Sequence, residues 1–117
     1  MQITELTFSS SLPVDGYGPG FFRVAGQVHH GPVLVAGDRV LPWEGLSDGA
    51  ALMALAGQID VLLIGTGAEI SPLPTELRDR LEAAGLGVEA MATPPAARTY
   101  NVLLSEKRRV AVALLPV

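Results

Sequence analysis

The chain has no cysteine, which excludes disulfides, thiolate metal sites and a cysteine nucleophile. Only 17% of its 117 residues are charged and only 5% are aromatic. The formal net charge is -4, whereas a surface that binds nucleic acid is normally basic. We therefore expect no nucleic-acid partner and no chemistry that depends on thiols.

Long apolar runs and targeting signals are also missing. No apolar stretch approaches the roughly 20 residues that a membrane-spanning helix needs. The first residues, Met1 to Glu5, do not form a basic region followed by an apolar one, so no signal peptide is predicted. We expect a soluble, cytoplasmic protein without a membrane span.

Catalytic side chains are scarce as well. His29 and His30 are the only histidines, and neighbours on a strand point to opposite faces, so the two do not readily chelate one metal. The run Ser9-Ser10-Ser11 lacks a Gly-x-Ser-x-Gly elbow and a matching base. The sequence therefore predicts no catalytic residues, no metal, no cofactor and no enzyme.

Apolar residues, by contrast, make up 49% of the chain, enough for one core in one domain over residues 1–117. Residues 1–45 are rich in glycine and proline and predict a β-rich meander. Short strands are expected at 21–24, 28–30, 33–36 and 39–42, with turns at 25–27 and 37–38.

Residues 46–117 predict alternating helices and strands. Ser47 is the expected cap of a helix whose apolar residues recur through Ile59 with helical spacing. Strands are expected at 61–64, 86–89 and 110–115, and further helices at 74–84 and 93–104. This pattern favours an α/β fold: a three-layer domain with a mostly parallel central sheet, flanking helices and an added antiparallel β-meander.

A ligand crevice is conceivable at the carboxyl end of this sheet, where open α/β sheets bind ligands. Gly65, Thr66 and Gly67 follow an apolar strand, and the helix bearing Arg98, Tyr100 and Asn101 starts just after the neighbouring strand. Exposed loop amides and an arginine suit a carboxylate or a phosphate.

Structural roles for the same residues are an open alternative. Ile70 stands where a dinucleotide fingerprint has its third glycine, although Glu89 sits where a ribose-binding acid belongs. Arg98 could instead pair with Glu69 or Glu89. Asn101 could tie down a loop, and the Tyr100 hydroxyl could be hydrogen-bonded in a half-buried position.

A protein interface is the second candidate site. Glycines surround the aromatic residues of segment 16–22, and exposed Tyr17, Phe21 or Trp43 would serve as interface anchors. The rival interpretation is that Phe22 and Trp43 cover one face of the sheet. We expect Phe22 to be buried and Tyr17 to be exposed.

Several segments, spread over nearly the whole chain, resemble the segments of one protein family and occur in the same order. They are residues 16–24, 30–31, 43, 63–67, 87–93, 98–104 and 108–115, with Arg98-Thr99-Tyr100-Asn101 as the most specific. Together they resemble the family of mitochondrial NADH dehydrogenase (complex I) assembly factor three and its prokaryotic relatives of unknown function. Ala97 departs from the cysteine of several relatives, so a thiol-dependent role is excluded for this member.

The resemblance implies a three-layer α/β fold and a non-catalytic protein-interaction module. Its expected partners are respiratory complex I subunits or assembly factors, because mitochondrial members help to build that complex. The alternative is a small anionic-ligand-binding protein or minor enzyme that uses the crevice near Gly65 and Arg98. The sequence is compatible with a monomer or with a homodimer joined through strand edges.

Overall fold

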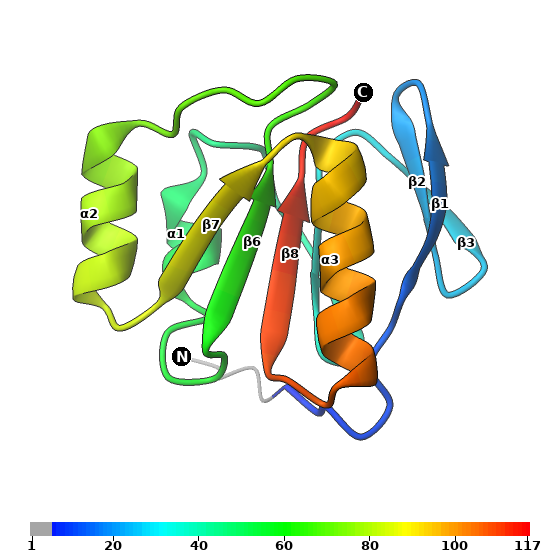
Figure 1. Ribbon diagram of the computed structural model, residues 1–117, viewed down its shortest axis with the longest axis horizontal. Helices are drawn as coiled ribbons and strands as arrows, with labels where there is room; N and C mark the ends of the chain where they lie inside the picture. Colours follow the sequence, from blue (N-terminus) through cyan, green and yellow to red (C-terminus); the bar gives the residue numbers. More distant parts are fainter. Residues whose placement is uncertain (1–5) are drawn as a thin grey trace.

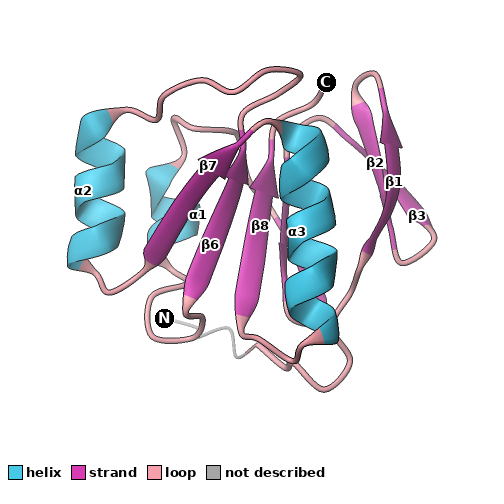
Figure 2. Cartoon of the chain, in the orientation of Figure 1, coloured by secondary structure: helices cyan, strands magenta, loops and turns pink. Residues whose placement is uncertain are grey.

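The computed structural model describes residues 6–117, which form three helices and eight strands (Figures 1 and 2). The helices are α1 (Gly49–Met53), α2 (Thr75–Ala83) and α3 (Thr93–Ser105). The strands are β1 (Val14–Gly18), β2 (Phe21–Val24), β3 (Gln27–His30), β4 (Val33–Ala36), β5 (Arg39–Leu41), β6 (Val61–Gly65), β7 (Gly87–Met91) and β8 (Val110–Leu114).

The larger sheet is mixed, with strand order β5-β4-β8-β6-β7. Strand β6 runs parallel to β7 and β8, because α2 and α3 provide the long crossovers that parallel strands need. Strand β4 is antiparallel to β8 and to β5, which it reaches through the short turn at Gly37 and Asp38. The expected mostly parallel sheet is thus parallel only across β7, β6 and β8.

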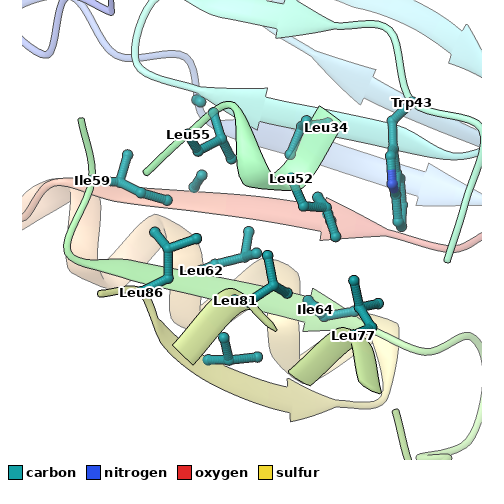
Figure 3. Packing of buried hydrophobic residues seen from close by; sticks show 14 of the residues in the cluster. Leu34, Trp43, Leu52, Leu55, Ile59, Leu62, Ile64, Leu77, Leu81 and Leu86 are labelled. Carbon is teal, nitrogen blue, oxygen red and sulfur yellow. The ribbon is translucent and has the colours of Figure 1, made fainter. Parts of the chain in front are cut away.

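Each face of this sheet carries an apolar cluster over its central strands, since successive residues of these strands enter two different clusters. Leu62 and Ile64 belong to the cluster that contains residues of α1 and α2, part of which is shown in Figure 3. Leu63, between them, belongs to the cluster beneath α3 and the meander. This explains why residues 61–64 read as a continuous apolar run.

Helix α1 is shorter than its sequence pattern predicts. Asp48, not Ser47, is the cap, and its carboxylate accepts a hydrogen bond from the Ala51 amide at 3.4 Å. The chain turns after Met53, and Gly57 has a φ of 83°, which ends the helical path. Leu55 and Ile59 are nevertheless buried, so the apolar spacing identified core residues although the helix ends early.

The smaller sheet has the order β1-β2-β3 and contains a strand that the sequence did not reveal. Residues 14–18 form β1 rather than part of a loop, and β1 pairs antiparallel with β2. The predicted turn between β2 and β3 is confirmed: Ala25 and Gly26 have φ values of 49° and 81°, as a tight hairpin turn requires.

Within residues 6–117, no helix combines the length and apolar character needed to cross a bilayer.

Candidate functional site

The loop that follows β6 uses its backbone amides within the protein. The Thr66 amide donates to the Met91 carbonyl at 2.8 Å, and the Gly67 amide donates to Thr93 Oγ1 at 2.9 Å. The Thr93 hydroxyl in turn donates to the Leu115 carbonyl at 2.7 Å. The amides that would hold an anion are therefore engaged by the end of β7 and the start of α3.

Gly65 is required for this closure. A Cβ at Gly65 would lie 2.8 Å from Thr93 Oγ1 and 2.9 Å from Thr93 Cα. The glycine thus allows α3 to approach the end of β6 closely. It does not serve here to let a phosphate approach the backbone. Thr93 is wholly buried and joins three chain segments, a role that the sequence pattern did not reveal.

Tyr100 lies in the centre of the cluster beneath α3 and is completely buried. Its hydroxyl donates to the Leu12 carbonyl at 2.6 Å. Burial raises the pKa of the Tyr100 phenol, because the charged phenolate would lose its hydration. The side chain is therefore neutral and anchors the segment that leads into β1.

Asn101 binds the same segment two residues further along the chain, at Val14. Its Oδ1 accepts from the Val14 amide at 3.0 Å, and its Nδ2 donates to the Val14 carbonyl at 2.8 Å. One side chain thus satisfies both backbone groups of a residue at the start of β1. This geometry agrees with the alternative in which Asn101 ties down a chain segment.

The six crevice residues therefore do not surround one opening. Tyr100 and Asn101 bind the segment before and at the start of β1, whereas Thr93 closes the loop at Gly65 and Gly67. Arg98 is exposed, and the ion pairs found within residues 6–117 do not include it. The expected pairs of Arg98 with Glu69 or Glu89 are thus not formed.

The three expected interface residues are also separated. Tyr17 is 41% exposed and lies opposite Phe22, which is fully buried, so both expectations are confirmed. Phe21 points to the other face of the small sheet, since successive residues of a strand alternate. Trp43 is only 5% exposed, so its assignment as a surface anchor is wrong.

Trp43 and Phe22 also cover opposite faces of the large sheet instead of one. Trp43 packs with Leu34 and Leu52 in the cluster on the α1 and α2 side, as Figure 3 shows, whereas Phe22 belongs to the cluster beneath α3. The Trp43 Nε1 atom is buried and has no hydrogen-bond partner among the described residues.

No three His, Cys, Asp or Glu side chains within residues 6–117 come together in a way that could hold a metal ion. The polar residues that converge at the ends of β6 and β8 bind other parts of the chain. The arrangement therefore supports a chain-joining role for the segment 93–101.

Solved bacterial structures share this arrangement of two sheets and three helices. The crystal structure of a Bartonella henselae protein, described as an outer membrane protein, has a TM-score of 0.83 and 38% identity over 92% of this chain and 97% of its own. A Bordetella pertussis protein described as an Mth938-like domain has a TM-score of 0.78 and 32% identity, over 99% and 92% of the two chains. The class is thus the mixed α/β fold of Mth938-like domains.

The chain belongs to the family of proteins of unknown function DUF498/DUF598, whose profile matches residues 14–115. An uncharacterized protein of Rhodobacter capsulatus is 58% identical over 116 residues, which cover 99% of this chain and 94% of that protein. The NADH dehydrogenase (ubiquinone) 1 alpha subcomplex assembly factor 3 of Danio rerio is 32% identical over 123 aligned positions, covering 99% and 71%. These matches confirm the resemblance inferred from the sequence.

Proposed function

We propose that this chain is a non-catalytic protein-binding module, a single cytoplasmic domain that assists the assembly of a respiratory complex of the NADH dehydrogenase type. The observation that carries the proposal is the use of its most specific motif. Tyr100 and Asn101 of this motif bind another segment of the same chain, and so does Thr93 on the same helix, so α3 builds a rigid body in place of a reactive centre. The name of the zebrafish relative supports the choice of complex.

The partner would be a subunit or a second assembly factor of such a complex, bound through the outer face of the small sheet. There Phe21 lies opposite His30, and Arg23 lies opposite Val28. Val28 is 48% exposed, an apolar side chain in an edge strand. Phe21 therefore remains an anchor of this surface, and Val28 takes the place of the buried Trp43.

Affinity capture of the tagged protein from native extract, with solubilised membranes included, tests the proposal. Quantitative mass spectrometry should show one stoichiometric partner or several subunits of the complex. Val28→Glu should reduce the captured amount by about tenfold, because it places a charge in an apolar contact. Ile70→Ser is the matched control, since Ile70 is an apolar residue that is 67% exposed in a distant loop. Protein recovered without any enriched partner would contradict the proposal.

A further inference from the structure

Part of the sheet face that carries α3, over β7, is left uncovered by the described part of the chain. Helix α3 packs mainly over β8 and β6 and barely reaches β7 (Figure 1). The opposite face is covered by residues of both α1 and α2. The surface beside α3, over β6 and β7, therefore has room for another element.

A groove of about 630 Å³ occupies this position. Its apolar walls come from β6, β7 and α3: Val61, Leu63, Met91 and Leu103. Val88 also lines the groove, although its side chain belongs to the apolar cluster on the opposite face of the sheet. The groove is thus an apolar trough between a helix and an edge strand.

The charged residues that line the groove are all acidic. They are Glu82 and Glu89, and the lining contains no lysine or arginine. Glu82 comes within 3.9 Å of Arg78 in an exposed pair, whereas Glu89 takes part in none of the ion pairs within residues 6–117. An occupant with basic side chains beside an apolar stripe would complement this rim, and an anionic lipid surface would be repelled.

The outer edge of β7 is partly protected against the addition of a strand. In this parallel ladder the Gly87 amide and the Met91 carbonyl bond towards β6, so the peptide groups of Val88 face outward. Arg78 Nη1 donates to the Val88 carbonyl at 3.4 Å. A partner is therefore better accommodated on the face of the sheet than on its edge, and helices are the elements that cover its faces in this fold.

We propose that this groove binds an amphipathic helix of a partner protein, with an apolar stripe flanked by lysine or arginine. The helix lies beside α3 and covers β6 and β7, with basic side chains towards Glu82 and Glu89. The inference rests on the proposed function as a protein-binding module and specifies a second contact surface, distinct from Phe21 and Val28.

Site-specific photo-crosslinking in native extract tests this proposal. A benzophenone amino acid replaces Leu103 in the groove, Val28 on the small sheet or Asp79 on the exposed side of α2. Crosslinks from position 103 should map to a helix-forming segment with apolar residues at helical spacing and flanking basic residues. Position 79 should give at least about tenfold less product.

Charge variants are then made in the protein that carries the crosslinker at position 103. They distinguish binding in this groove from binding elsewhere on the surface. Glu89→Lys should lower the crosslink yield at least about tenfold, Glu89→Gln should lower it less, and Glu76→Lys on α2 should leave it unchanged. Crosslinks from position 28 without any from 103 would overturn this inference alone. Crosslinks from 103 to a second copy of this chain, or to an acidic or extended segment, would also overturn it. No crosslink at either position would overturn the proposed function as well.

Discussion

The carboxamide of Asn101 pairs with both backbone groups of Val14, although 87 positions separate the two residues. Helix α3 thereby holds the start of β1 in the way that a neighbouring strand would. The Tyr100 hydroxyl fixes Leu12 just before it. The small sheet is thus fastened to the large one by the residues that most clearly identify the family.

Asn101→Leu should lower the free energy of unfolding by about 2–3 kcal/mol, because it leaves the Val14 amide and carbonyl without partners. Urea unfolding measures the loss, and amide hydrogen exchange at Val14 should become faster. Ser105→Ala is a control on the same helix, since the Ser105 hydroxyl only donates to the Val102 carbonyl at an exposed position. Unchanged exchange at Val14 would show that Asn101 does not hold β1.

Tyr100→Phe should cost about 1 kcal/mol near neutral pH, through the lost hydrogen bond to Leu12. Its pH dependence is more specific. Burial raises the pKa of Tyr100 above its ordinary value of 10.0, so above that pH the unfolded state binds fewer protons than the folded state. The wild-type free energy of unfolding should therefore be unaffected by this group below about pH 9 and fall by up to about 1.4 kcal/mol per pH unit above about pH 10.

Urea unfolding of the wild type and of Tyr100→Phe at a series of alkaline pH values checks this. The stability difference between the two proteins should shrink as the pH rises past about 10, because only the wild type loses the contribution of the buried phenol. Tyr17 remains in both proteins and is exposed, so it serves as an internal reference. A constant difference across that range would contradict the buried, neutral Tyr100.

Gly65→Ala should destabilise the protein by about 3 kcal/mol or more, because the added methyl group meets the backbone and hydroxyl of Thr93 within 2.9 Å. Gly16→Ala is the matched control, since a Cβ there meets no heavy atom within 4 Å and φ is not positive. It should change stability by less than about 1 kcal/mol. Thermal unfolding followed by circular dichroism compares the two, and equal effects would contradict the close approach at Gly65.

Trp43→Phe should change stability by only about 1 kcal/mol, although Trp43 is a large core residue. The smaller ring leaves a cavity, but the variant also removes the buried Nε1 donor that has no partner among the described residues. Trp43→Ala, by comparison, should cost about 3–5 kcal/mol. Circular dichroism is the suitable probe, because Trp43 is the only tryptophan. Equal losses in both variants would contradict the small effect expected from removing an unpaired Nε1.

Periodicity and turn chemistry determined the local part of this fold. Residues 61–64 read correctly as a doubly covered strand, because both neighbouring layers demand apolar side chains there. The helix predicted at 74–84 is α2, whose buried residues Leu77 and Leu81 recur with helical spacing. The tight turn at Ala25 and Gly26 was predicted from their position between two short strands. Each of these features depends on residues that are close in the sequence.

The tertiary structure alone decided which distant segments meet. Strand β4 lies antiparallel beside β8, which made the sheet mixed, and no local pattern encodes that pairing. Gly65 and Asn101 suggested a ligand crevice. The exposed backbone amides of a glycine loop and an asparagine carboxamide can bind an anion or another chain segment equally well. The contacts with Thr93 and Val14, which form only when the chain has folded, determined the roles of Gly65 and Asn101. A polar group takes its role from the partner that the packing of the core brings within hydrogen-bonding distance.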